Sequence, residues 1–381
     1  MSPSPFLLPP LPLSASEDKW GSFGMPEFQA TALVSNLSGM LQVSARADLF
    51  WQTGLLQEAR SSSAIEGIRT TLNELLEERV GRAVPVERQD DVRDVANCCE
   101  ALQTGLEEID RGRPLTLSLV RALHAQLLQG ARGARKMPGQ WRQQQVYIGA
   151  PGSGPHAASY VPPAPVHVLP LLENWEQFLQ RKDINPLIQA AVMHAQFEMI
   201  HPFLDGNGRI GRLLIALLFL EKKVLTKPCF FMSSFFQHHR QTYYELLGNV
   251  SKHGDWRAWI EFFLKAVAEQ SRDTIALFMN MNRLYDESGE AFCASTRSSH
   301  ALSVLDCLFQ KPLFTLPDLQ KQLSGRKLSH QSLVNILNRL EQSGHIERIA
   351  PGRGRTPALW RFRALMALLA SDALRHSPPH R

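Results

Sequence analysis

Hydrophobic residues recur at three- and four-residue spacing along most of this 381-residue chain, a pattern typical of amphipathic helices that pack on a common core. The helical pattern starts near residue 26. It predicts helices in the segments 27–42, 48–68, 70–80, 92–109, 116–129, 168–182, 185–200, 209–220, 233–253 and 255–288, the last of which is long enough for two. The sequence therefore predicts a mainly α-helical fold.

Three stretches break this pattern. Residues 1–16 are rich in proline, and we expect them to form an extended arm that lies over the body of the protein. In residues 130–166 the helical spacing lapses. Two β-prone runs there, "QVYIG" and "ASYVPP", flank a turn of Gly, Pro and Ser, which predicts a β-hairpin on the body. Small residues at 288–299 predict a linker.

A separate pattern follows this linker. We expect three helices, in 300–310, 315–323 and 329–344, with Thr315 and Ser329 as the N-caps of the last two. A strand, a Gly/Arg turn and a second strand come next in the sequence "HIERIAPGRGRTPALWRF". Three helices followed by a two-stranded wing is the order of a winged helix-turn-helix domain.

This C-terminal part is more basic than the rest of the chain. Residues 296–381 contain 13 Lys or Arg and 5 Asp or Glu, a net charge of +8, whereas the whole chain carries +5. A basic module suits DNA or another acidic partner, and Arg353 and Arg355 of the predicted turn would lie near a DNA backbone. The predicted recognition helix offers Arg339 as its one basic side chain, with Gln331, Asn335 and Asn338 beside it. Docking of a protein, or of a second copy as a homodimer, is an equal alternative.

The composition excludes several classes of protein. With 44% hydrophobic and 20% charged residues, the chain resembles an ordinary soluble protein. No stretch approaches the roughly 20 apolar residues of a membrane span, and the N-terminus lacks the basic region of a signal peptide. The five cysteines show no C-x-x-C spacing, so we expect reduced thiols in a cytoplasmic protein.

The stretch "HPFLDGNGRIGR", residues 201–212, places polar groups between two apolar runs. Pro202 disfavours helix at the residue before it, so His201 is predicted at a helix end. The Gly206-Asn207-Gly208 turn then leads into a new helix. Free backbone N–H groups and the positive end of the helix dipole make such a turn an anion site.

The flanking side chains suit a polyphosphate. Arg209 and Arg212 share one helix face and would hold phosphate oxygens, while Asp205 would hold Mg²⁺ against them. His201 has the side chain best suited to act as a general base near neutral pH. These residues indicate phosphoryl or nucleotidyl transfer. A P-loop is excluded, since its motif is absent, and zinc bound by His194, His201 and Asp205 is a weaker alternative.

This stretch resembles the signature of the Fic family, H-P-F-x-[DE]-G-N-G-R-x-x-R, at every specified position. Residues 25–270 extend the resemblance. The predicted hairpin is similar to the flap of Fic proteins, and "SSAIEG" is similar to their inhibitory motif, [ST]-x-x-x-E-[GN]. The C-terminal part resembles the winged-helix module of some members.

The resemblance implies a Fic helical core with a β-hairpin flap and a protein adenylyltransferase, which moves AMP from ATP to a Ser, Thr or Tyr hydroxyl of a target protein or of itself. His201 would be the base and Asp205 the Mg²⁺ ligand. The implied nucleotide-binding residues are Glu66, Asp205, Gly206, Asn207, Gly208, Arg209, Ile210, Gly211, Arg212, Tyr243 and Tyr244. The implied docking residues of the flap, which would add the target as a strand, are Val146, Tyr147, Ile148 and Gly149. Tyr243 and Tyr244 are placed near the adenine by the resemblance, and two aromatic residues packed in the core are an equal alternative.

The resemblance also implies an inhibitory motif formed by Ser62, Glu66 and Gly67. Ser62 and Glu66 are four residues apart and share a helix face, and Gly67 permits the helix to end. In the family, the matching glutamate pairs with the second arginine of the signature, here Arg212. An arginine that is occupied by a carboxylate cannot bind a phosphate.

We therefore expect a chain of five parts. They are an extended arm at 1–25, a helical region at 26–110 with the inhibitory helix around 55–67, a catalytic core at 111–287 with the flap at 142–163 and the signature at 201–212, a winged-helix domain at 296–368, and a tail at 369–381. Two other functions remain open. One is a nucleotide sensor that regulates DNA binding, and the other is related chemistry, either the transfer of another nucleotide or the removal of AMP.

Overall fold

A computed structural model describes residues 4–375, except residues 15, 17, 19, 131, 150–154, 327 and 355. The described chain is mainly helical, as the periodicity predicts. Its α-helices are α1 (Met25–Val43), α2 (Ala47–Ile65), α3 (Leu72–Arg79), α4 (Val86–Asp110), α5 (Leu117–Leu127), α6 (Pro165–Leu179), α7 (Pro186–Ile200), α8 (Asn207–Glu221), α9 (Ser233–His238), α10 (Arg240–His253), α11 (Trp256–Thr296), α12 (Ala301–Gln310), α13 (Leu316–Gln322), α14 (His330–Gln342) and α15 (Arg363–Arg375). Two single-turn 3-10 helices are η2 (Ala134–Lys136) and η3 (Pro155–Ala157), and the strands are β1 (Leu313–Thr315), β2 (Ile346–Ala350) and β3 (Leu359–Phe362).

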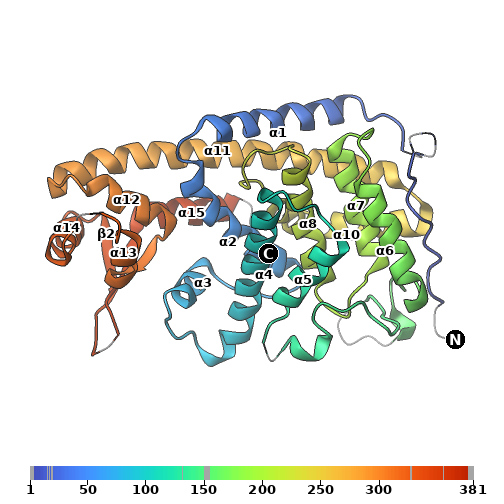
Figure 1. Ribbon diagram of the computed structural model, residues 1–381, viewed down its shortest axis with the longest axis horizontal. Helices are drawn as coiled ribbons and strands as arrows, with labels where there is room; N and C mark the ends of the chain where they lie inside the picture. Colours follow the sequence, from blue (N-terminus) through green and yellow to red (C-terminus); the bar gives the residue numbers. More distant parts are fainter. Residues whose placement is uncertain are drawn as a thin grey trace.

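Helices α7 and α8 form the centre of the core and lie beside each other (Figure 1). Both are buried on nearly every side, which fits their almost continuous apolar sequence. Asn185 caps α7, because its side chain accepts a hydrogen bond from the N–H of Leu187 at 2.9 Å, and Pro186 occupies the first turn. The candidate signature lies in the short connection between these two helices, so the core holds both of its ends.

Helix α11 runs along the whole molecule, with α1 packed against it (Figure 1). Its 41 unbroken residues form one helix where the sequence allowed two, and they show that the predicted linker is wrong for residues 288–296. The small residues there serve close packing instead of flexibility. A Cβ on Gly289 would lie 3.2 Å from Leu302, and Ser288, Gly289 and Thr296 are buried. The expected boundaries at 287 and 296 therefore fall inside one helix.

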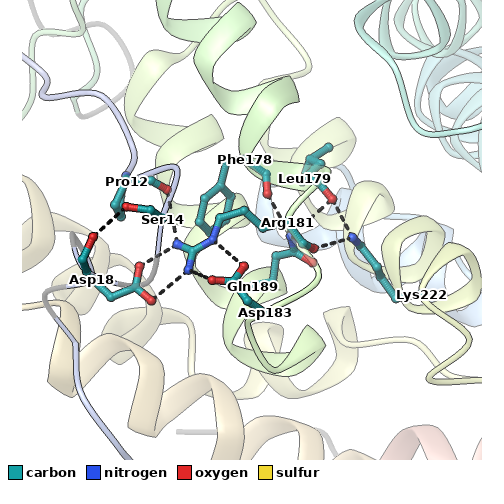
Figure 2. A network of polar contacts seen from close by, with 10 residues as sticks. Pro12, Ser14, Asp18, Phe178, Leu179, Arg181, Asp183, Gln189 and Lys222 are labelled. Carbon is teal, nitrogen blue, oxygen red and sulfur yellow. Dashed lines mark hydrogen bonds and ion pairs between the residues drawn. The ribbon is translucent and has the colours of Figure 1, made fainter.

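The N-terminal arm is extended and lies on the body, as predicted for its described part. Leu11 exchanges two hydrogen bonds with the side chain of Asn174 on α6, at 2.6 and 3.1 Å. Figure 2 shows the second attachment, in which the buried guanidinium of Arg181 binds both carboxylate oxygens of Asp18, at 2.6 and 3.0 Å, and also binds Asp183. The arm is thus held by the hydrogen bonds to Asn174 on α6 and by the ion pair with Arg181 between α6 and α7.

The C-terminal module contains the three helices and two strands that the sequence predicts. Thr315 and Ser329 cap α13 and α14 through their side chains, as expected. The structure adds β1, which pairs with β3, so that the sheet has three antiparallel strands in the order β1-β3-β2. It also adds α15, which contains the predicted boundary at residue 368.

The predicted DNA-reading surface of this module is weaker in the structure. The guanidinium of Arg339 donates a hydrogen bond to the backbone oxygen of Thr296 at 2.5 Å, and Gln331 bonds to Asn335 at 3.1 Å. Arg355 lies outside the described residues. DNA binding stays a prediction from charge.

Within the described residues, no helix has both the length and the apolar character that crossing a bilayer requires.

Candidate functional site

His201 ends helix α7 in the left-handed conformation, with φ 48°. This strain follows from the Pro202 that comes next, which prevents the helix from continuing. The Nδ1 atom of His201 lies 3.2 Å from the backbone oxygen of Glu198. Since a carbonyl oxygen only accepts, Nδ1 carries the proton and Nε2 keeps a free lone pair. Burial lowers the pKa of His201 to about 4, so the ring is neutral at pH 7.

The carbonyl end of α7 is bonded by residues of the flap region. The buried guanidinium of Arg142 donates to the backbone oxygen of His201 at 2.8 Å and to that of Ile200 at 3.3 Å. The backbone N–H of Arg142 donates to Pro202 at 2.8 Å, and the hydroxyl of Tyr160 donates to Met199 at 2.8 Å. Carbonyl groups that a helix end leaves unpaired are thereby satisfied, and the position of His201 is fixed. No pattern in the sequence indicated this role of Arg142, because an arginine in a predicted loop normally faces solvent.

The side chain of Asn207 also stabilises the loop, a role that the resemblance did not imply. Its side-chain oxygen accepts from the N–H of Phe203 at 2.8 Å, and its amide nitrogen donates to the oxygen of Phe203 at 2.9 Å. Both polar atoms of this buried side chain are thus used to close the loop before α8. The amide nitrogen has a second hydrogen, so the binding of a nucleotide by Asn207 stays a prediction. The backbone N–H groups of the first turn of α8, which the helix itself leaves unpaired, are further donors for an anion.

His124 on α5 packs against this loop, and no feature of the sequence distinguished it from a core histidine. Its ring stacks on Phe203 at 3.6 Å. The N–H of Gly139 donates to Nδ1 at 2.9 Å, so Nε2 carries the proton and donates to the backbone oxygen of Asp205 at 3.0 Å. Burial lowers the pKa of His124 to about 4 and keeps the ring in this neutral form. His124 therefore orients Asp205 through its backbone.

The two arginines of the signature lie in different surroundings. The side chain of Arg209 is 5% exposed, and its Nε and Nη1 atoms have no hydrogen-bond partner. Its nearest carboxylate oxygen, on Asp205, is 3.8 Å from Nη2. A buried guanidinium with two unpaired donors is costly unless an anion binds it. Arg209 is thus prepared for an anionic ligand.

Arg212 is fully engaged by α2. Its Nε donates to the hydroxyl of Ser62 and its Nη2 to the backbone oxygen of Ser62, both at 2.9 Å. Nη2 also lies 2.8 Å from a carboxylate oxygen of Glu66, so the implied pair is present. Burial alone would raise the pKa of Glu66, but the guanidinium of Arg212 outweighs it and holds that pKa below its ordinary value.

Two glycines make room for carboxylates at this point. A Cβ on Gly208 would lie 2.3 Å from Glu66 Oε1, so only glycine lets Glu66 reach Arg212 across the start of α8. Gly67, which follows Glu66, has a φ of +85°, and α2 ends beside it as predicted. A Cβ on Gly211 would meet Glu198 at 2.3 Å. Burial raises the pKa of Glu198 to about 8, and its Oε1 atom has no partner.

These side chains face a cavity of about 300 Å³. Of the residues predicted at the site, it gathers Glu66, His201, Asp205, Gly206, Asn207, Gly208 and Arg209. It does not gather Arg212, which Glu66 covers, or Ile210 and Gly211, which are buried within α8. Among the described residues, no group of three or more His, Cys, Asp or Glu could hold a metal ion. The weaker zinc hypothesis therefore lacks its ligands.

Comparison with known proteins agrees with this geometry. Residues 114–219 match the Fic/DOC family, and residues 27–107 match the N-terminal region of the Fic/DOC family. Residues 27–219 therefore contain the N-terminal region and the domain of the Fic/DOC family. The match ends at Phe219 within α8, so it covers the signature and the two helices that hold it.

Two relatives of this chain are named protein adenylyltransferase Fic. The one from Nematostella vectensis is 29% identical over 236 residues, which are 60% of this chain and 50% of the relative. The one from Aedes aegypti is 31% identical over 144 residues, 37% of this chain and 25% of the relative. The chain thus spans half or less of the length of these curated relatives.

Solved Fic structures share the fold. A Fic family protein from Desulfovibrio desulfuricans is 20% identical, with a TM-score of 0.59 over 91% of this chain and 98% of that one. Residues 134–508 of Fic-1 from C. elegans are also 20% identical, with a TM-score of 0.53 over 67% of this chain and 73% of that one. At this identity the likeness concerns the fold alone.

The two tyrosines implied near the adenine of a Fic site lie elsewhere than in the cavity. Tyr243 is buried, and its hydroxyl lies 2.8 Å from Nε2 of His194, whose Nδ1 donates to the backbone oxygen of Gly211 at 3.0 Å. Tyr243 is thus a core residue that supports α8, which is the alternative left open above. Tyr244 is 42% exposed and stacks under the guanidinium of Arg240.

Among the described residues, the predicted flap contains one antiparallel bridge, between Ile148 and Tyr160, with hydrogen bonds of 2.9 and 3.1 Å. The backbone oxygen of Val146 is bonded by the side chain of Gln145 at 3.1 Å. The docking of a target on Tyr147 and Gly149 stays a prediction. The flap residues 150–154 lie outside the described residues.

Proposed function

We propose that this protein is a protein adenylyltransferase, which transfers AMP from ATP to a hydroxyl group of a protein, and that Glu66 holds it in an inactive state. The observation that carries the proposal is one cavity with two complementary ends. His201 faces it with a neutral ring and a free Nε2, and Arg209 faces it with two unpaired buried donors. One end suits the removal of a proton, and the other suits the binding of a phosphate.

The reaction is a displacement at the α-phosphorus. The Nε2 atom of His201 accepts the proton of a Ser, Thr or Tyr hydroxyl, and the oxygen forms a new bond to phosphorus. The bond between the α-phosphorus and the bridging oxygen breaks, and pyrophosphate leaves with its electron pair. General base catalysis by a positioned histidine contributes about 10²- to 10⁴-fold. The pKa of His201, lowered by burial to about 4, keeps the base free at neutral pH.

The phosphates of ATP would lie at the start of α8. The unpaired N–H groups of its first turn and the helix dipole favour negative charge there. Arg209 would pair with one terminal phosphate. Arg212 would pair with another, but only after Glu66 has moved away, since its Nη2 is 2.8 Å from that carboxylate. These are the groups that stabilise charge on the leaving pyrophosphate.

Mg²⁺ would bind through Asp205. The Asp205 side chain is 46% exposed at the cavity, and its Oδ1 accepts only the N–H of Gly206 at 2.7 Å within normal hydrogen-bond distance. A single carboxylate is a sufficient protein ligand for Mg²⁺ when substrate phosphates and water complete the shell. When bound, the ion would neutralise charge on the phosphates. His124 fixes the loop that presents this carboxylate.

The target segment would align on the open edge of the flap. Tyr147 and Gly149 offer backbone groups for strand addition, whereas Ile148 already pairs with Tyr160. Arg142 connects the flap region to His201, so the docked hydroxyl and the base would share one support. The chain's own hydroxyl groups are possible targets as well as those of another protein.

The test uses purified protein and ATP that is labelled at the α-phosphate. We expect Glu66→Gly to label protein strongly and the Glu66→Gly/His201→Ala double variant to label nothing. Labelled UTP and GTP in parallel reactions address the choice of nucleotide. Equal labelling by the double variant would reject His201 as the base, and labelling from UTP alone would reject AMP as the transferred group.

A further inference from the structure

Another cavity, of about 640 Å³, lies between α2 and the C-terminal module. It is lined by Gln57 and Arg60 of α2, by Thr70 after that helix, and by Arg361 and Arg363 where β3 passes into α15. Figure 1 shows α15 next to α2. The cavity therefore connects the helix that carries Glu66 with a module far along the chain.

The charge of this cavity has one sign. Its lining residues include three arginines and no Asp or Glu. Arg361 and Arg363 share one carboxylate, that of Glu347, at 2.7 and 4.0 Å. Arg60 has no carboxylate within ion-pair distance among the described residues, and its guanidinium bonds only to the side-chain oxygen of Gln57 at 3.3 Å. An arginine that is partly buried without a counter-ion favours the binding of an anion.

Two further polar groups in the cavity wall are unpaired. Thr70 is 8% exposed, yet its hydroxyl has no hydrogen-bond partner. The amide nitrogen of Gln57 is also buried and without a partner. Buried polar groups in folded proteins are normally bonded to protein or to ordered water, so each of these two groups has capacity for a further partner. Leu72, Met366 and Leu369 add an apolar side to the same wall.

We propose that this cavity binds a small anion that carries phosphate groups and joins α2 to the C-terminal module. Arginine forks and single hydroxyl and amide donors are the groups that recognise phosphate oxygens in proteins. At 100° per residue, Gln57 and Arg60 lie on the side of α2 opposite to Ser62 and Glu66. The anion would thus bind one face of α2 while Arg212 is held by the other.

Titration calorimetry with inorganic pyrophosphate tests the site in the full-length chain. The background variant is Arg209→Gln, which removes the unpaired donors of the other phosphate-binding cavity, while Arg212 stays covered by Glu66. We expect this variant to bind one pyrophosphate per chain. Adding Arg60→Gln should weaken binding at least tenfold, because a hydrogen bond from a charged donor is lost. Adding Arg283→Gln, which removes an exposed charge on α11, should leave the affinity unchanged.

A Thr70→Val variant separates binding from folding. It removes the unpaired hydroxyl at nearly constant volume, so the ligand-free protein should melt at the same or a higher temperature while its affinity for pyrophosphate falls two- to tenfold. Replacing pyrophosphate by ADP distinguishes a nucleotide, which would bind more tightly through the apolar wall, from an inorganic polyphosphate, which would not. The proposal is overturned if Arg209→Gln binds no pyrophosphate, if Arg60→Gln behaves as Arg283→Gln does, or if Thr70→Val keeps full affinity.

Discussion

The contact between Glu66 and Arg212 allows the strength of the proposed inhibition to be calculated. Arg212 is 1% exposed and Glu66 is 35% exposed, with 2.8 Å between Nη2 and Oε1. A hydrogen bond to a charged group contributes about 1.5–3 kcal/mol, and the partial exposure of Glu66 places this pair near the lower end. ATP must break this contact before Arg212 can bind a phosphate.

Glu66→Gly removes that cost. A gain of about 1.4–2 kcal/mol in the binding of the transition state corresponds to a rate about ten to thirty times higher. The variant should fold normally, because Glu66 itself has an ordinary φ of −84° and Gly67 still provides the positive φ at the helix end. Arg212 keeps both hydrogen bonds to Ser62, so its position is preserved.

The assay measures initial rates of label transfer from α-labelled ATP at several ATP concentrations. Glu66→Gln is the matched control, since it retains an amide of similar size but no charge, and its rate should lie between those of the wild type and Glu66→Gly. If Glu66→Gly is no faster than the wild type, Glu66 does not inhibit the enzyme. If Glu66→Gln is as slow as the wild type, shape rather than charge is responsible.

Three further predictions concern groups in or near the site, and each uses the Glu66→Gly background. Arg142→Lys should lower kcat about tenfold or more with little change in the KM for ATP. Lysine cannot bond all the backbone carbonyl oxygens at the end of α7 through which Arg142 fixes the position of His201. A change in KM alone would contradict this prediction. Tyr243→Phe should lower the free energy of unfolding by about 1–3 kcal/mol, since Nε2 of His194 loses its hydrogen-bond donor. The KM for ATP should stay unchanged. A raised KM at unchanged stability would instead place Tyr243 at the adenine. The transfer rate should stay constant from pH 8 to pH 6 and fall below about pH 5, because burial lowers the pKa of His201 to about 4 and protonation removes the base; a half-maximal rate near pH 6.5 would show an ordinary histidine.

The sequence predicted the parts of the site that depend on neighbouring residues. His201 lies at a helix end because proline follows it, and Gly206 has a φ of 79° at the start of α8. The caps Asn185, Thr315 and Ser329 follow from the same local chemistry. Neighbouring residues determine these features, so the sequence pattern alone is sufficient to predict them.

The missed features depend on contacts between distant segments. Arg142 was indistinguishable from a surface arginine until the fold placed it under the end of α7. The small residues near Gly289 resembled a linker because periodicity does not reveal that Leu302 packs against them. Tertiary packing decided each of these cases.

The C-terminal module keeps the prediction of DNA binding, which rests on its charge. Its test is the full-length chain added to duplex DNA over a range of salt concentrations. Binding through phosphate contacts should weaken steeply as salt rises. A mobility that does not change at low salt would leave protein docking as the role of the module.

Covalent transfer of AMP is the central claim, and mass spectrometry of the Glu66→Gly protein tests it most directly. The protein is incubated with a cell extract and with ATP labelled at either the α- or the γ-phosphate. We expect peptides that gain the mass of one AMP unit on a Ser, Thr or Tyr, with label from the α-phosphate only. The Glu66→Gly/His201→Ala protein should give no such peptides. Label from the γ-phosphate, or a complete absence of AMP-bearing peptides, would contradict it.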